Sequence, residues 1–247
     1  MILVTGGAGF IGSVIVWALN QRGIDDIIIV DHLGSGDKWK NLTGLRYADY
    51  CEKSDFLSYL DKGAFDTHKF EAVLHLGACS STTESDASYL IKNNFEFSKA
   101  LALWANANRA RFVYASSAAT YGDGEHGFDD DVDGIAKLTP LNMYGYSKQM
   151  FDLWLKHRGL LDRCVGIKFF NVFGPNEYHK GSMRSFILKA FEQINQTGEV
   201  KLFRSHREGY GDGEQLRDFI YVKDAAEMTL HFLDNQAGGL FNVATGI

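Results

Sequence analysis

The stretch MILVTGGAGFIGSVIVWALNQRGIDDIIIVD, residues 1–31, decides the fold of this chain. It opens with a short apolar run at 2–4, passes through a glycine-rich segment at 5–12, and continues with apolar residues at helical spacing. A second apolar run follows at 27–30. This succession is typical of a β-turn-α-β unit, which the sequence therefore predicts here.

Three glycines of this unit, Gly6, Gly9 and Gly12, fall where a bound dinucleotide requires them. One allows the tight turn, one lets the backbone approach a pyrophosphate, and one lets the helix pack close to the strand. The helix N-terminus adds N–H groups that attract phosphate. Asp31 ends the second strand, where a carboxylate binds the adenosine ribose. We therefore expect a dinucleotide site rather than a purely structural turn.

The rest of the chain alternates between apolar runs and helical patterns. Further strands are expected at 45–48, 71–78, 111–116, 164–170, 200–203, 217–222 and 239–244, and further helices at 54–61, 84–108, 144–157, 183–196 and 224–234. This alternation predicts an α/β fold with a doubly wound parallel sheet of the Rossmann type. The acidic segment 123–134 is expected to be a solvated loop.

A smaller lobe is expected to interrupt the main domain. We assign 1–171 to a dinucleotide-binding domain that is rejoined by about 217–247, and 172–216 to part of a substrate lobe. The chain stops just after Thr245-Gly246, which looks like the start of a turn. The remainder of the substrate lobe is therefore expected after 247.

Bulk composition narrows the class of protein. Of the 247 residues, 45% are hydrophobic and 23% are charged, as in ordinary globular proteins. The net charge of -6 disfavours a nucleic-acid partner, and no apolar run is long enough to span a membrane. The three cysteines are far apart, which predicts neither disulfides nor a metal site. A reducing cytoplasm fits this cysteine pattern, and no basic leader precedes the first strand.

A second constellation carries chemistry. Tyr144 and Lys148 are four residues apart, so a helix would place the phenol and the ammonium on one face. The ammonium is expected to lower the pKa of the phenol towards working pH, as a base for an alcohol proton requires. Ser117, at the end of a predicted strand, would hold the substrate oxygen. An ordinary surface pair is the alternative for an isolated Tyr-Lys spacing, but the upstream glycine unit favours catalysis.

Together these motifs resemble the extended short-chain dehydrogenase/reductase superfamily, which includes nucleotide-sugar epimerases and dehydratases. The opening at 5–12, the serine strand at 114–122 and the segment RDFIYV at 217–222 carry the resemblance. The stretches at 77–84 and 170–183 resemble most closely the branch that epimerises ADP-heptoses. The similarity extends over essentially the whole chain.

The resemblance implies a reaction. Bound NADP would oxidise C6″ of ADP-D-glycero-D-manno-heptose transiently and then reduce it from the other face, supplying heptose for the inner core of lipopolysaccharide. Two acid/bases would serve the two faces, and the matching positions are Tyr144 and Lys180, with Ser117 orienting the substrate. Without the resemblance, Lys180 would be read as a solvated loop lysine. The resemblance also implies a homo-oligomer, often a pentamer.

Other positions carry over as ligand contacts. The implied cofactor contacts are Phe10, Ile11, Asp31, His32, Lys38, Lys53, Leu76, Gly77, Ala78, Cys79, Ser80, Asn93, Lys148 and Val172. The implied substrate contacts are Asn171, Ser182, Lys189, Phe203, Arg204, Ser205, His206 and Arg217. Lys38 and Lys53 would offset the charge of a 2′-phosphate beside Asp31, which favours NADP, with NAD possible. Arg217 suits a pyrophosphate because its guanidinium donates two parallel hydrogen bonds.

The sequence also departs from the branch. Lys189 replaces a histidine, the stretch 204–206 replaces a smaller, partly acidic one, and the loop before Arg217 is longer. Three alternative functions stand beside the 6-epimerase. A 4,6-dehydratase would need an acid where Ala118 and Ala119 stand. A UDP-hexose 4-epimerase shares Tyr, Lys and Ser but needs no second base, and a non-catalytic NAD(P)-sensing module would need none of the three.

Overall fold

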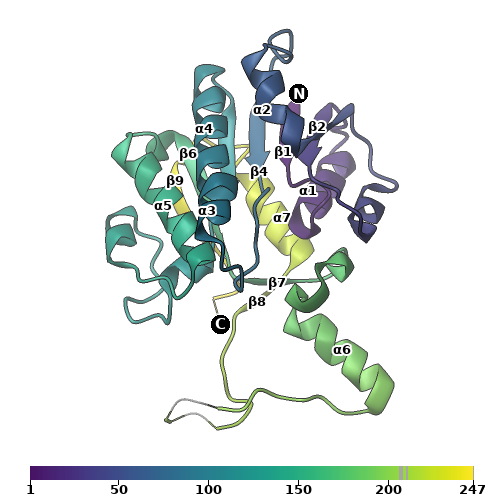
Figure 1. The fold of residues 1–247 in the computed structure, drawn as a ribbon, viewed down its shortest axis with the longest axis vertical. Coiled ribbons are helices and arrows are strands. Elements are labelled where there is room, and N and C mark those ends of the chain that lie inside the picture. The colour runs from purple at the N-terminus through teal and green to yellow at the C-terminus, as the bar shows by residue number, and fades with distance from the viewer. Residues whose placement is uncertain (206–207, 210, 247) are drawn as a thin grey trace.

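The computed structural model describes residues 1–205, 208–209 and 211–246. Its centre is a seven-stranded parallel sheet with the strand order β3-β2-β1-β4-β5-β6-β9 (Figure 1). The strands are β1 Ile2–Thr5, β2 Ile27–Asp31, β3 Asp49–Glu52, β4 Ala72–His75, β5 Arg111–Ala115, β6 Cys164–Phe169 and β9 Gly239–Val243. The predicted doubly wound α/β fold is confirmed.

Helices cover both faces of the sheet. One core contains apolar residues of α1 (Phe10–Gln21) and α7 (Val222–His231), and the other contains those of α2 (Lys53–Asp61), α4 (Phe97–Ala107) and α5 (Met143–His157). Within β2, Ile27 and Ile29 face the first core, and Ile28 and Val30 face the second. Because both faces are buried, the strand reads as a continuous β-branched run rather than an alternating one.

The position of the site follows from the strand order. From β1 the chain builds the sheet outward through β2 and β3, and then returns to add β4 on the opposite side of β1. The carboxyl ends of β1 and β4 therefore flank a topological switch point, where ligands bind in open α/β sheets. The segments Gly6–Gly12 and Leu76–Ser80 begin at these two strand ends.

Four sequence expectations were wrong in detail. The edge strand β3 begins at Asp49 rather than at 45, and its pairing with β2 starts at Ile28. The single helix expected at 84–108 is divided into α3 (Ala87–Leu90), a π-helical turn (Ile91–Glu96) and α4. No strand occupies 200–203. The segment 123–134 is not simply solvated, because Asp123 and Phe128 line the main cavity and a 3₁₀ helix starts at 132.

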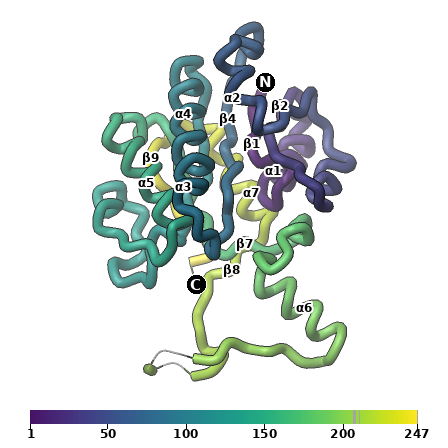
Figure 2. The backbone as a smooth tube through the Cα atoms, viewed as in Figure 1, coloured from purple at the N-terminus to yellow at the C-terminus, as the bar shows by residue number. Residues whose placement is uncertain are grey.

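A smaller group of elements lies beyond the carboxyl ends of the sheet strands (Figure 1). A two-stranded parallel pair joins β7 (Asn171–Phe173) to β8 (Phe219–Tyr221), and β7 was not predicted. A 3₁₀ segment, Tyr178–Met183, leads to α6 (Phe186–Thr197), which the Ser185 hydroxyl caps by accepting from Leu188 N–H at 3.1 Å. No residue of α6 is buried, and Figure 2 shows this helix projecting away from the sheet. Shorter 3₁₀ helices are Asp37–Leu42, Ala118–Tyr121, Val132–Lys137 and Leu161–Arg163.

Candidate active site

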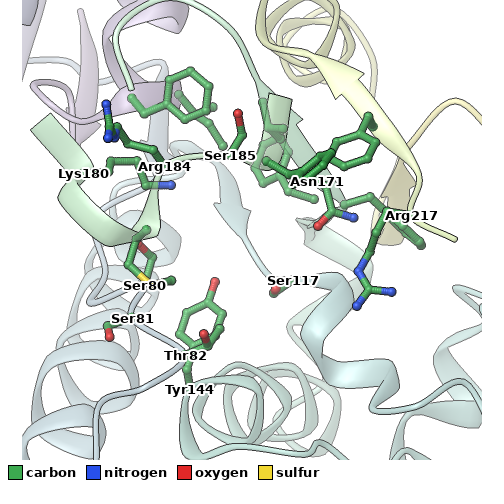
Figure 3. A pocket seen from close by; sticks show the side chains of 18 of the residues that line it. Ser80, Ser81, Thr82, Ser117, Tyr144, Asn171, Lys180, Arg184, Ser185 and Arg217 are labelled. Carbon is green, nitrogen blue, oxygen red and sulfur yellow. The ribbon is translucent and has the colours of Figure 1, made fainter. Parts of the chain in front are cut away.

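A cavity of about 1600 Å³ opens at the carboxyl ends of the strands. One wall comes from the glycine loop after β1 and the segment after β4, a second from the ends of β5 and α5, and a third from the segment 179–189. The cavity therefore lies between the sheet and the smaller set of elements around α6. Figure 3 shows side chains from these walls pointing towards a common space.

The glycine loop fits a dinucleotide. Gly6 has φ +73°, and a Cβ there would lie 2.6 Å from the backbone nitrogen of Gly77. At Gly12 a Cβ would lie 2.1 Å from the Gly6 carbonyl oxygen, so only glycine lets α1 start this close to β1. No side chain caps the N-terminus of α1, and its first turn holds no acid. The N-terminus of α1 therefore offers free N–H groups and a positive dipole end to an anion such as a pyrophosphate.

Asp31 is held inward at the end of β2. Its side chain is 6% exposed, and its carboxylate accepts from the Ala8 N–H at 2.8 Å and from the His32 N–H at 2.7 Å. Lys38 forms an ion pair with the same carboxylate. Most of the acceptor capacity of Asp31 is therefore used within the protein, and Lys38 lies beside it in the cavity wall.

The proposed catalytic helix α5 is fixed at its N-terminus. The Asn142 side chain caps it by accepting from Gly145 N–H at 2.9 Å. A Cβ at Gly145 would lie 2.6 Å from the Ala119 carbonyl oxygen, so the helix packs directly on the segment after Ser117. This packing brings Tyr144 and Ser117 to the cavity together, and the phenol points into it (Figure 3).

The expected effect of Lys148 on the phenol is wrong for this structure. Burial raises the pKa of Tyr144; a hydrogen bond with Ser117 lowers it, and the nearby Cys79 raises it further. Lys148 instead donates to the Ala115 carbonyl at 2.8 Å. Burial lowers the pKa of Lys148 to about 8, against the opposing influence of Asp152. Desolvation outweighs the charge effect that the sequence spacing suggested.

Lys180 approaches the cavity from the wall opposite Tyr144 (Figure 3). Its ammonium lies 5.4 Å from the centre of the Phe10 ring, and burial lowers its pKa while Glu177 raises it. Glu177, 1% exposed, fixes this segment by accepting from Gly174 N–H at 3.2 Å and from the Ser185 hydroxyl at 2.8 Å. Lys180 is therefore a half-buried cation on a segment that the hydrogen bonds of Glu177 hold in place, rather than a freely solvated lysine.

Most of the expected site residues line this one cavity. They are Gly6, Gly9, Phe10, Ile11, Gly12, Asp31, Lys38, Leu76, Gly77, Ala78, Cys79, Ser80, Ser117, Tyr144, Lys148, Asn171, Val172, Lys180, Ser182, Lys189, Phe203, Arg204, Ser205 and Arg217. Three expected cofactor residues lie outside the lining: His32 contacts Glu52, and Lys53 contacts Asn93. His206 lies outside the described residues.

Sequence reasoning missed several residues of the lining. They include Ser81, Thr82, Asp123, Phe128, His179, Met183, Arg184, Ser185 and Phe186. Arg184 adds a cation near Lys180; it donates to the Gly181 carbonyl at 3.0 Å and pairs with Glu192 at 2.5 Å. It carried no usable signal, because the backbone at Gly181, with φ +54°, breaks the helical spacing between Lys180 and Arg184. Phe128 carried none, because its loop has no periodic pattern.

Among the residues that the structure describes, no helix is both long and apolar enough to cross a membrane. The same residues contain no group of three or more His, Cys, Asp or Glu side chains arranged to hold a metal ion.

The family profile described as "NAD dependent epimerase/dehydratase family" matches residues 2–244. This chain belongs to that family. The match spans the glycine loop, Tyr144, Lys148 and Lys180, and so includes every element that builds the cavity.

Curated members of the family include close relatives. ADP-L-glycero-D-manno-heptose-6-epimerase of Nitratidesulfovibrio vulgaris is 54% identical over 247 residues, which is 100% of this chain and 76% of the relative. The enzyme of the same name from Fusobacterium nucleatum is 48% identical over 250 residues, which cover 100% of this chain and 75% of the relative.

Solved structures of two epimerases have a fold similar to that of this chain. A crystal structure of the Helicobacter pylori ADP-L-glycero-D-manno-heptose-6-epimerase superposes with a TM-score of 0.83 at 29% identity, covering 100% of this chain and 77% of that one. A Thermus thermophilus UDP-glucose 4-epimerase complexed with NAD gives a TM-score of 0.76 at 27% identity, covering 100% and 78%.

Proposed function

We propose that this chain is an ADP-heptose 6-epimerase that inverts C6″ of ADP-D-glycero-D-manno-heptose in the cytoplasm, for the inner core of lipopolysaccharide. The observation that carries the proposal is the arrangement of Tyr144 and Ser117 on one cavity wall with Lys180 on the opposite wall. A two-faced inversion needs proton donors on both sides of the reacting carbon. Relatives that are 46–54% identical and carry this name support the same substrate.

The cofactor that we propose is NADP. When bound, its nicotinamide would remove hydride from the sugar and return it to the opposite face. The glycine cradle and the uncapped start of α1 would hold the pyrophosphate. Asp31, already occupied by Ala8 and Lys38, has little acceptor capacity left for ribose hydroxyls. Lys38 would instead provide a cation for a 2′-phosphate, which favours NADP over NAD.

The residues of this chain have distinct tasks in the proposal. Tyr144 exchanges a proton with the C6″ hydroxyl on one face, and Ser117, which hydrogen-bonds the phenol, holds the same oxygen. Lys148, one helical turn after Tyr144 and held by the Ala115 carbonyl, would supply a positive charge on the same wall as the phenol. Lys180 exchanges the proton on the other face. Its half-buried ammonium has a lowered pKa, which brings it closer to the range in which proton transfer is efficient.

The substrate would extend from the sheet towards α6. We propose that 172–216 form part of a substrate lobe on a dinucleotide-binding domain built from 1–171 and 217–247. Arg217 and Lys189 both line the cavity on this side, and Arg217 points into it (Figure 3). A guanidinium and an ammonium at this point suit the pyrophosphate of a nucleotide sugar. By the family resemblance, we propose a homo-oligomeric assembly.

Direct assay tests the proposal. The purified chain with NADP is incubated with ADP-D-glycero-D-manno-heptose, and the two C6″ epimers are separated by chromatography. Parallel incubation with UDP-glucose tests the 4-epimerase reaction of the structural neighbours. Conversion of only the heptose substrate is the expected result. Formation of UDP-galactose alone would assign the site to the 4-epimerases, and turnover of neither substrate would contradict the proposal.

A further inference from the structure

Behind the cavity wall lies a buried cluster of three charged side chains, two of which the proposed mechanism does not use. Asp152 on α5 is 0% exposed and Lys168 on β6 is 1% exposed, and neither lines the cavity. Lys148, 4% exposed, lies one helical turn before Asp152 on the same face of α5. Three charges are thus enclosed together, although charged residues are rarely fully buried unless they are paired.

Asp152 is the shared anion of this cluster. Its carboxylate accepts from the Tyr114 hydroxyl at 2.8 Å and from the Ser116 hydroxyl at 2.7 Å. The Lys168 ammonium lies 3.6 Å from the same carboxylate. These partners satisfy the carboxylate in its charged form, which is the form that accepts hydrogen bonds without donating any.

The cluster also holds the strand end that carries Ser117. Lys148 donates to the Ala115 carbonyl, and Asp152 fixes the Ser116 hydroxyl. Lys168 donates to the Thr120 hydroxyl at 2.6 Å, and Thr120 in turn donates to the Ser117 carbonyl at 2.8 Å. Each of the three residues 115–117 is therefore connected to one of the buried charges.

We propose that Asp152 and Lys168 are positioning residues, in which the ionised Asp152 keeps Lys148 protonated beneath Tyr144 and Lys168 compensates the remaining charge of Asp152. The inference rests on the role of Lys148 in the proposed function. Two buried cations share one anion, so the cluster presents one net positive charge to a phenol that must lose its proton. Removing the anion leaves Lys148 with only a carbonyl partner.

The other titratable groups around the cluster leave this assignment intact. Four other titratable groups face the cluster: Tyr114 of β5, Cys164 of β6, Tyr121 of the 3₁₀ helix Ala118–Tyr121, and Asp130 of the neighbouring loop. His75 and Cys79 also interact with Lys148. Burial raises the pKa of Asp152 while Lys168 lowers it, and Asp152 is the first group that raises the pKa of Lys148 against burial. The effect of Lys168 on the pKa of Asp152, and of Asp152 on the pKa of Lys148, therefore agree with the positions of the three side chains.

The experiment measures the pKa of Lys148 directly by NMR. In protein labelled with ¹⁵N-lysine, the Nζ signal is assigned from its loss in Lys148→Met and is titrated between pH 6 and pH 10, without substrate. Asp152→Asn is expected to lower the pKa of Lys148 by about one unit or more. The double variant Asp152→Asn/Lys168→Met, which removes the anion together with the lysine paired to it and so leaves no unpaired charge at position 168, is expected to lower it as well.

Two controls separate charge from structure. Tyr114→Phe removes one hydrogen bond to the Asp152 carboxylate but keeps its charge. Asp133→Asn removes an exposed carboxylate that pairs with Lys156 of the same helix at 2.8 Å. Both controls are expected to keep the Lys148 titration close to that of the parent chain. An equal shift in Tyr114→Phe would mean that loosened packing, rather than lost charge, moves the titration, and would overturn the inference.

Activity gives the second readout. Epimerisation by the parent chain should fall as the pH rises through the Lys148 pKa of about 8, and in Asp152→Asn the fall should begin at a lower pH. An unchanged Lys148 titration in Asp152→Asn and in the double variant would overturn the inference. A shifted titration in a chain that turns over no nucleotide sugar would support the charge cluster while contradicting the proposed function, so the two failures are distinguishable.

Discussion

Tyr144 illustrates what a single residue contributes in this site. Its phenol lies in a desolvated wall where its pKa is raised, so the side chain alone is a poor base at neutral pH. The hydrogen bond with the Ser117 hydroxyl acts in the opposite direction. The phenol therefore depends on its neighbours to exchange a proton, as expected for a group that changes charge only during the reaction.

Replacing Tyr144 by phenylalanine removes the proposed acid/base and little else. We expect epimerisation to fall about 10²- to 10⁴-fold, because that is the usual contribution of a positioned proton donor. Cofactor affinity, measured by fluorescence titration of NADP, should remain nearly unchanged. Turnover within a few-fold of the parent chain would exclude Tyr144 as the acid/base.

Lys38 and Lys53 are the two lysines expected to favour NADP over NAD. Lys38 lines the cavity beside Asp31, whereas Lys53 contacts Asn93 outside the lining. Lys38→Ala should weaken NADP binding about tenfold or more and NAD binding much less, since a charged hydrogen bond contributes about 1.5–3 kcal/mol. Lys53→Ala serves as the comparison. Equal loss of affinity for both cofactors in Lys38→Ala would remove the argument for a 2′-phosphate.

At this scale the sequence predicts residue type and spacing but not desolvation. The glycines, Tyr144 and Ser117 were recognisable because their chemistry depends on local spacing or on a strand end. The direction of the Tyr144 pKa was wrong because burial by distant segments is not visible in a four-residue spacing. Arg184 and Phe128 were missed for the same reason: loops bring them to the cavity.

The π-helical turn Ile91–Glu96 is one of the elements that the sequence did not predict. Its Asn94 side chain is 1% exposed and accepts from Cys79 N–H at 2.8 Å. The same amide donates to the Cys79 carbonyl at 3.0 Å and to the Ser147 hydroxyl at 3.1 Å. One side chain thus fastens the segment after β4 to the catalytic helix α5, which is a reason for a helix to widen locally at a functional site.

Asn94→Ala tests this element. The substitution leaves buried polar groups of Cys79 without partners, so the free energy of unfolding should fall by about 1–3 kcal/mol, measured by urea denaturation. Because Cys79 lines the cavity, NADP affinity should fall too. Asn108→Ala, which removes an exposed hydrogen bond to the Trp104 carbonyl, is the matched control and should change stability by less than about 0.5 kcal/mol.

His75 connects β4 to its neighbours through two hydroxyls. It lies 2.6 Å from Thr5 Oγ1 and 2.7 Å from Ser98 Oγ, and burial lowers its pKa to about 3. The unfolded chain, with a histidine pKa of about 6.5, binds the extra proton first as the pH falls. The stability that neutral His75 provides is therefore present above about pH 6.5 and is lost as the pH falls towards 3.

Urea unfolding between pH 6.5 and pH 4.5 measures this dependence. His75 alone should contribute up to about 1.4 kcal/mol of lost stability per pH unit. A His75→Gln variant cannot take up that proton, so its stability should fall less steeply over the same range. Parallel slopes for the two proteins would contradict a neutral, buried His75.

On the scale of the whole molecule, stability is concentrated in the two cores beside the sheet. Phe151 of α5 is 2% exposed and stacks edge-on against Tyr114 with ring centres 4.9 Å apart. Phe191 of α6 is 62% exposed. Phe151→Ala should lower the free energy of unfolding by about 3–5 kcal/mol, and Phe191→Ala by less than about 0.5 kcal/mol. A large loss in Phe191→Ala would mean that α6 is covered in solution.

The overall architecture was predictable because its signals repeat along the chain. Most strands of the main sheet are short apolar runs, and helical patterns separate most of them along the chain, so the doubly wound sheet emerges even when one boundary is misplaced, as at β3. The pair of β7 and β8 was harder to predict, since its strands are three residues long and distant in the sequence. Pairing of such short segments depends on tertiary context rather than on local pattern.

The position of β9 has a consequence for biosynthesis. This strand pairs with β6 in register from Val165↔Gly239 onward, yet all of 170–238 is translated between them. A nascent chain on the ribosome therefore exposes the open edge of β6, with its unpaired backbone groups, until β9 emerges. Such an edge is a template for aggregation. Chains whose translation stalls before 239 should accordingly depend on chaperones far more than the finished protein does.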